Sequence, residues 1–168
     1  LLGTAACALV ATWALWGSYL PAYSPSAVPN RVARPLSYEF EGVARLIGMA
    51  PAAPAARPGE TIRLSLYWQA LRPAETELLA YVHSVETMIV RRDSVPATGN
   101  LLATEWRSGE TWAEHYIVTI PQNTGAPLTD LLIAGLYDPQ AGRPLQARNE
   151  SGHPVTPVIN TLTILSSD

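Results

Sequence analysis

Alternation of apolar and polar side chains dominates the chain from residue 36 onward. In residues 60–70, every second side chain from Ile62 to Trp68 is apolar, and the side chains between them are polar or amphipathic. A period of two is typical of a β-strand that buries one face and exposes the other. We therefore predict a strand over residues 60–70, with its apolar face turned toward a core.

Strands of this kind are predicted along the whole region. They cover residues 36–40, 43–47, 60–70, 78–85, 87–95, 111–120, 129–137 and 158–165. Residues 129–137 are apolar on both faces, which favours a central strand, whereas Arg91 and Arg92 favour an edge position for residues 87–95. Turn residues separate the strands, and no helical period follows residue 35. This spacing predicts a mainly β domain over residues 36–168, an antiparallel β-sandwich of immunoglobulin-like or jelly-roll-like type.

The N-terminal stretch differs, because residues 1–20 carry no charged side chain. As a helix this stretch spans roughly 30 Å, the thickness of the hydrocarbon core of a bilayer. Aromatic residues suited to a membrane interface lie in its second half and just after it: Trp13, Trp16, Tyr19 and Tyr23. A signal peptide and a buried core helix are the competing interpretations, but the aromatic belt and the lack of a polar face favour a transmembrane helix. We predict a single-pass anchor in the lipid bilayer.

Residues 21–35 connect the predicted anchor to the β domain. Their prolines are Pro21, Pro25, Pro29 and Pro35. Proline at this density prevents a helix and favours a stiff, extended spacer. The spacer would hold the β domain a short distance from the membrane surface.

Net charge and cysteine content limit which partners and which covalent links are expected. A net charge of -3 leaves no broad basic surface, so no nucleic-acid partner is expected. The single cysteine, Cys7, excludes an intrachain disulfide. Lipidation of Cys7 is disfavoured, because Thr4 stands where a leucine-like residue is needed and the apolar run continues beyond Cys7.

The titratable residues form no spacing that is typical of a catalytic or metal site. His83 and His115 could be neighbours across strands, but no third metal ligand is evident. Glu105, Glu110 and Glu114 lie close together in sequence, yet a glycosidase needs two carboxylates at a defined separation. We expect these acids on a solvated loop or strand face.

Asp130 and Asp138 are candidate ligands of a calcium ion, but the chain has no D-x-D-x-D-G loop. No nucleophile elbow, phosphate-binding glycine loop or haem motif is present either. The sequence therefore predicts a protein that is not an enzyme and that has neither a metal nor a cofactor.

Three aromatic residues are candidates for contact with a sugar or a protein partner. They are Tyr67, Trp106 and Trp112. Tyr67 points away from the apolar face of its predicted strand, and Trp106 lies in a predicted loop. A sugar-stacking platform and partial burial with a polar handle are both open interpretations of these residues.

Several short motifs carry a resemblance to a known family. In chain order they are YEF at 38–40, VARLIG at 43–48, RPGET at 57–61, LSLYWQA at 64–70, YVH at 81–83, WRSGE at 106–110, IP at 120–121 and GLYDP at 135–139. Together they resemble the C-terminal extracytoplasmic β-sandwich, with the last membrane span, of multi-spanning lipid-phosphate-sugar-dependent glycosyltransferase-like proteins of green non-sulfur bacteria. The resemblance implies that residues 1–20 are a last span and that the β domain is extracytoplasmic. It supplies no catalytic residue, because catalysis in that class belongs to loops near the first spans.

These observations predict a membrane-anchored accessory or interaction module, a non-catalytic subunit or domain of a larger membrane assembly. Its expected partners are the lipid bilayer and other membrane protein subunits, with a glycan as a further candidate. One alternative is the C-terminal part of a membrane glycosyltransferase that handles lipid-linked sugar. The other is a carbohydrate-binding module.

Overall fold

The computed structural model describes residues 28–51, 53–99 and 101–166. Three predicted features lie outside the described residues: the transmembrane helix over residues 1–20, residues 21–27 of the proline-rich spacer, and the interface aromatics Trp13, Trp16, Tyr19 and Tyr23. Among the helices that are described, none has the length and apolar composition needed to cross a bilayer.

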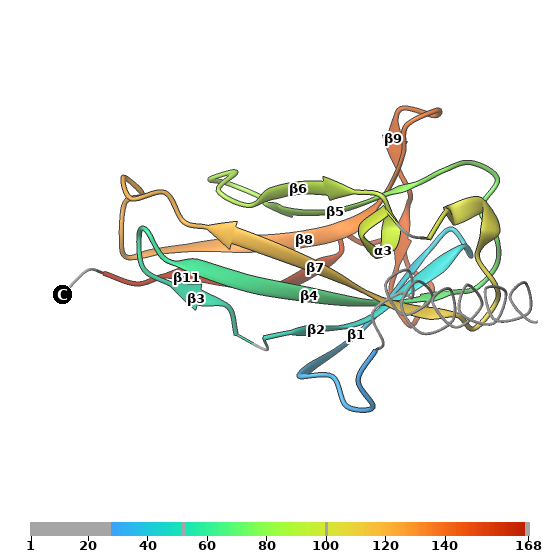
Figure 1. The fold of residues 1–168 in the computed structure, drawn as a ribbon, viewed down its shortest axis with the longest axis horizontal. Coiled ribbons are helices and arrows are strands. Elements are labelled where there is room, and N and C mark those ends of the chain that lie inside the picture. The colour runs from blue at the N-terminus through green and yellow to red at the C-terminus, as the bar shows by residue number, and fades with distance from the viewer. Residues whose placement is uncertain (1–27, 52, 100, 167–168) are drawn as a thin grey trace, which may run out of the picture.

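The described chain folds into two β-sheets (Figure 1). The five-stranded sheet has the order β10-β1-β2-β4-β7. Its strands are β1 (Arg34–Phe40), β2 (Ala44–Ala50), β4 (Thr61–Ala70), β7 (Thr111–Thr119) and β10 (Ala147–Arg148). Each neighbouring pair in this sheet is antiparallel.

The six-stranded sheet has the order β3-β11-β8-β5-β6, with β9 paired to β8. Its strands are β3 (Ala55–Ala56), β5 (Leu79–Ser84), β6 (Arg91–Ser94), β8 (Leu128–Asp138), β9 (Arg143–Pro144) and β11 (Val158–Ile164). Only β3 and β11 run parallel among the pairs of this sheet that the structure describes.

A single apolar core joins the two sheets into a β-sandwich. On β4 the side chains from Ile62 to Trp68 are buried at every second position, as the sequence pattern predicts. Trp68 stacks on Trp112 of β7, with ring centroids 6.2 Å apart. Trp106 packs on Trp112 at 4.7 Å, and Phe40 packs on Trp68 at 5.4 Å. Aromatic pairs of this kind add about 0.5–1.5 kcal/mol beyond the burial of their area.

A strand overlaps every range predicted from the sequence, and β1, β2 and β8 extend beyond theirs. β8 is central in its sheet and β6 is an edge strand, so both of these predictions are confirmed. The prediction for β2 ended too early, because a register shift between Leu46 and Gly48 breaks the period of two before the strand ends at Ala50.

Short elements were missed. β3 lies between two predicted strands, where no strand was predicted, and neither β9 nor β10 was predicted. No helical period is predicted after residue 35, and the described residues there include two single turns, α3 (Pro96–Gly99) and the 3-10 turn η2 (Ala103–Glu105). Elements of two to four residues are too short to show a period, so only their tertiary partners define them.

Asp130 on β8 fastens the connection between β5 and β6. Its carboxylate accepts hydrogen bonds from the Glu86 N–H at 3.1 Å, the Thr87 N–H at 2.8 Å and the Thr87 hydroxyl at 2.5 Å. Burial by itself would raise the pKa of Asp130, but the hydroxyl of Thr87 and the backbone N–H groups of Glu86, Thr87 and Leu131 outweigh it. The pKa of Asp130 is therefore held below its ordinary value of 3.8.

We predict that Asp130→Asn lowers the free energy of unfolding at pH 7 by about 2 kcal/mol, because hydrogen bonds to a charged acceptor are lost. A carboxyl whose pKa is lowered by folding stabilises the folded state at pH values above its ordinary pKa. This stabilisation is lost as the pH falls through the folded-state pKa. The difference in free energy of unfolding between the wild type and Asp130→Asn should therefore shrink below pH 3.8. Urea unfolding at pH 7 and pH 3 measures it. Glu86→Gln, an exposed charge change in the same loop, is the control, and a difference that is constant with pH would contradict the assignment.

Candidate functional site

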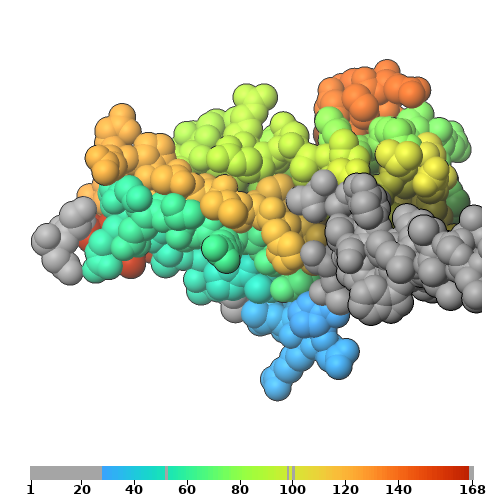
Figure 2. All heavy atoms as spheres, in the orientation of Figure 1, coloured from blue at the N-terminus to red at the C-terminus, as the bar shows by residue number. Residues whose placement is uncertain are grey.

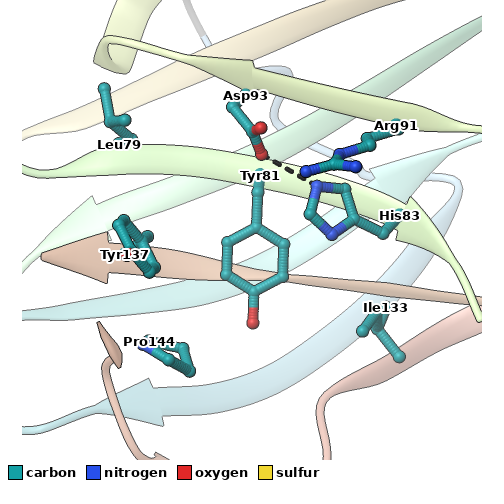
Figure 3. A pocket seen from close by; sticks show the side chains of 8 residues that line it. All are labelled: Leu79, Tyr81, His83, Arg91, Asp93, Ile133, Tyr137 and Pro144. Atoms are coloured by element: carbon teal, nitrogen blue, oxygen red, sulfur yellow. Dashed lines mark hydrogen bonds and ion pairs between the residues drawn. The ribbon is translucent and has the colours of Figure 1, made fainter. Parts of the chain in front are cut away.

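A groove lies on the outer face of the six-stranded sheet. On β5, Ala80, Val82 and Ser84 are buried in the core, so the alternate side chains point outward. The groove encloses about 550 Å³. It is lined by Leu79, Tyr81, His83, Arg91, Asp93, Ile133, Tyr137 and Pro144, which come from β5, β6, β8 and β9 (Figure 3). We call this site the β5 groove.

Tyr81 forms the floor of the β5 groove because Gly135 on β8 leaves room for its ring. The two residues are direct partners in the sheet register. A Cβ atom at Gly135 would lie 2.6 Å from the Tyr81 hydroxyl oxygen and 2.8 Å from the Cζ atom of the ring, closer than any side chain tolerates. The ring therefore lies across the neighbouring strand, between Tyr137 and His83 (Figure 3). A glycine covered by a cross-strand aromatic is a recurrent way to stabilise a sheet.

Polar groups gather at one end of the β5 groove. The His83 Nε2 atom lies 2.8 Å from the Asp93 Oδ1 atom, and the His83 ring lies 5.0 Å from the Tyr81 ring between centroids. Arg91 is the partner of His83 in the register of β5 and β6. The opposite end is apolar, where Leu79, Tyr137 and Pro144 lie (Figure 3).

The phenol of Tyr81 remains neutral at physiological pH. Burial first, and then the negative charge of Asp93, raise the pKa of Tyr81 above its ordinary value of 10.0. A neutral phenol can both donate and accept a hydrogen bond. The residues that line the groove therefore carry two phenol rings with their hydroxyls, one carboxylate, one imidazole and one guanidinium.

The aromatic residues singled out in the sequence do not form a surface platform. Tyr67 is 8% exposed, Trp106 is 1% exposed and Trp112 is fully buried. Trp112 faces inward on β7, and Trp106 follows the η2 turn, which folds over the sandwich and packs this indole on Trp112. Because burial of a large apolar ring is favourable, Trp106 and Trp112 belong to the core, whereas Tyr67 is buried on the other face of β4, outside the core cluster. None of the three is proposed again as part of a sugar platform.

The turn that carries Trp106 is held by Glu77. Its carboxylate accepts hydrogen bonds from the Ala103 N–H at 2.9 Å and from the Thr104 hydroxyl. Burial raises the pKa of Glu77, but the Thr104 hydroxyl and the backbone N–H groups of Ala103 and Thr104 outweigh it, so its pKa lies below the ordinary value. Glu77 therefore stabilises the turn by accepting these hydrogen bonds.

The histidines and acids weighed in the sequence are also dispersed. His83 and His115 lie in different sheets, so the prediction that they could be neighbours is wrong. Asp130 lies near the start of β8 and Asp138 at its end. Among the residues with defined positions, no group of three or more histidine, cysteine or acidic side chains could hold a metal ion.

Glu114 departs most from its predicted place. It was expected on a solvated face, but it is 1% exposed on the inner face of β7. Its carboxylate accepts hydrogen bonds from the Trp112 Nε1–H at 3.1 Å and from the Ala97 N–H of α3. A buried carboxylate needs such donors, and here they fasten α3 to the edge of the sandwich. Glu105 remains exposed, and Glu110 accepts from the Arg107 N–H at 3.1 Å in its own turn.

The β5 groove was missed as a site in the sequence, although part of its signal was there. The alternation in residues 78–85 already placed Tyr81 and His83 on the face opposite Val82. What the sequence lacked was the register that brings Gly135 beneath Tyr81 and Asp93 beside His83.

Neither a protein-family model nor a curated protein matches the chain. Among solved structures, the C-terminal domain of wzt is similar, with a TM-score of 0.49 and 14% identity over 86% of this chain and 84% of that chain. A Niemann-Pick type C2 protein from the Japanese carpenter ant gives a TM-score of 0.44 and 13% identity over 76% of this chain and 98% of that chain. Likeness at this level carries no information about ligand or role.

We predict that Trp106→Ala acts on stability, lowering the free energy of unfolding by about 3–5 kcal/mol, because it leaves a cavity beside Trp112. Leu102→Ala removes a side chain that is 44% exposed from the same connection, and its effect should be below about 1 kcal/mol. Denaturant unfolding followed by tryptophan fluorescence measures both. A stable Trp106→Ala variant that has lost glycan binding would contradict the assignment to the core.

Proposed function

We propose that the domain is a non-catalytic binding module whose β5 groove holds a sugar ring against Tyr81. The observation that carries this proposal is the placement of the Tyr81 ring across Gly135, in an open groove on the outer face of the sheet. A pyranose has an apolar face of C–H groups that suits the face of an aromatic ring, and its edge of hydroxyls needs polar partners.

The groove has the size and the mixture of surfaces that such a ligand requires. Its volume of about 550 Å³ falls within the usual range for small-ligand sites, about 300–1,000 Å³. Tyr81 and Tyr137 supply apolar area, while Asp93, His83 and Arg91 supply hydrogen-bonding groups along one end. Carboxylate and guanidinium groups make charge-assisted hydrogen bonds to hydroxyls, which are stronger than neutral ones.

We further propose that the module is anchored in the cell membrane by residues 1–20 and faces the extracytoplasmic side, as an immunoglobulin-like or jelly-roll-like accessory domain of a larger membrane assembly. Support comes from the uncharged length of that stretch and from the family resemblance of the motifs. A groove for sugar suits both a stand-alone module and the C-terminal part of a glycosyltransferase that handles lipid-linked sugar.

Tyr81→Ala should weaken glycan binding by about tenfold or more, because the stacking surface is lost. Gly135→Ala should weaken binding similarly while keeping Tyr81, since the added methyl group displaces the ring. The measurement is a glycan array followed by titration with the best ligand. The full chain is kept in a polyoxyethylene detergent, because sugar-headed detergents would compete.

Leu131→Ala is the matched control, because Leu131 is 42% exposed on β8 but does not line the groove. This variant should bind as the wild type does, and circular dichroism should show all three variants folded. A wild-type chain that binds no glycan, or a folded Tyr81→Ala variant with unchanged affinity, would contradict the proposal.

The anchor is tested separately by expressing the chain in bacteria and extracting the membranes at alkaline pH. We expect the wild type to stay in the pellet, because its uncharged stretch matches the hydrocarbon core. Replacing both Leu9 and Val10 by arginine should release the chain, since each central charge costs about 2.5–3.5 kcal/mol. Release of the wild-type chain would count against a transmembrane anchor.

A further inference from the structure

Arg91 is the charged group of the β5 groove whose hydrogen-bonding capacity is unused. It is exposed on β6, and in the described part of the chain its guanidinium makes no hydrogen bond or ion pair. The neighbouring Arg92 differs, because its Nη1–H donates to the Arg91 carbonyl oxygen at 2.8 Å. The acid of the groove, Asp93, is already hydrogen-bonded to His83. The groove therefore offers a free cation next to an engaged carboxylate.

We propose that the β5 groove selects a negatively charged sugar unit, with Arg91 binding its anionic group while the ring lies on Tyr81. This inference rests on the proposed sugar-binding function and names the ligand class. A guanidinium presents a planar fork of donors that matches a carboxylate or a sulfate ester with two parallel hydrogen bonds. A neutral sugar offers that fork hydroxyl groups only, without the opposite charge or the matching pair of acceptor oxygens.

The arrangement of the groove gives the ligand a direction. Leu79 pairs with Tyr137 at the apolar end, and His83 pairs with Ile133 toward the polar end. Arg91 lies beside His83 at that polar end (Figure 3). The anionic group is therefore placed over β6, and the apolar face of the sugar extends toward Tyr137 and Pro144.

Asp93 is the residue lining the groove that would oppose an anion. Its Oδ1 atom lies 2.8 Å from the His83 Nε2 atom, so the imidazole stands as its partner inside the groove. Its side chain is also 46% exposed, so solvent screens its repulsion. The exposed guanidinium of Arg91 is screened as well, but two aligned hydrogen bonds add to its charge.

The test compares ligands that differ only in charge. Oligomers of galacturonate, glucuronate and mannuronate are titrated into the full chain, each beside its methyl-esterified form. We expect the wild type to bind at least one acidic oligomer about tenfold more tightly than the ester. Arg91→Gln should abolish the preference, so that this variant binds the acid no more tightly than it binds the ester. Arg92→Gln removes the same charge one residue away, and it should keep the preference.

The outcomes separate this inference from the proposed function. Equal binding of acids and esters by the wild type, abolished by Tyr81→Ala, would overturn the anionic preference and leave sugar binding intact. Loss of the preference for acids over esters in Arg92→Gln as well as in Arg91→Gln would overturn the specific role of Arg91. General electrostatic attraction would then explain the preference. A chain that binds sulfated galactan but no uronate, and loses this binding in Arg91→Gln, would support the anionic preference. The anionic group would then be a sulfate ester.

Discussion

The packing of two sheets against each other through their inward side chains is the constraint on which the other features depend. Trp68 and Trp112 stand on neighbouring strands, β4 and β7, and stack within the core. Phe40 and Trp106 enclose this pair from β1 and from the loop after η2. Because every second residue is committed to this core, the remaining side chains form two outer surfaces. Figure 2 shows the outer surface in the orientation of Figure 1, where the segment around β9 projects at the top.

Carboxylates hold the connections between the strands; those of Asp130 and Glu114 are buried, and that of Glu77 is partly exposed. Asp130, Glu114 and Glu77 each accept backbone N–H groups from a loop or short turn that has no strand partner. Each N–H group that packs against the sandwich needs an acceptor, and an ionised carboxylate is a stronger acceptor than a carbonyl. These three acids therefore stabilise the fold. None of them lines the β5 groove, whose acid is Asp93.

The sequence was most accurate where structure depends on local periodicity. The central position of β8 and the edge position of β6 followed from their patterns of apolar and charged residues. It was least accurate for isolated residues in turns. For Trp106, predicted to lie in a loop, sugar stacking and partial burial both stayed open, and the structure buries the indole almost completely. Glu114 occupied an inward position of a strand that alternates well, and its burial depended on donors from α3, a turn that no pattern revealed.

The sequence by itself determined where the strands run and which face of each is buried, because alternation is a property of adjacent residues and needs no knowledge of the partner strand. Only the tertiary structure decided which outward side chains meet. Tyr81 lies over Gly135, which is distant in sequence, because β5 pairs with β8 in one register, and a shift by one residue would place Ala134 or Leu136 opposite the ring. Register comes from the packing of whole sheets and from long-range hydrogen bonds, so the groove exists only once the two sheets have closed on their shared core.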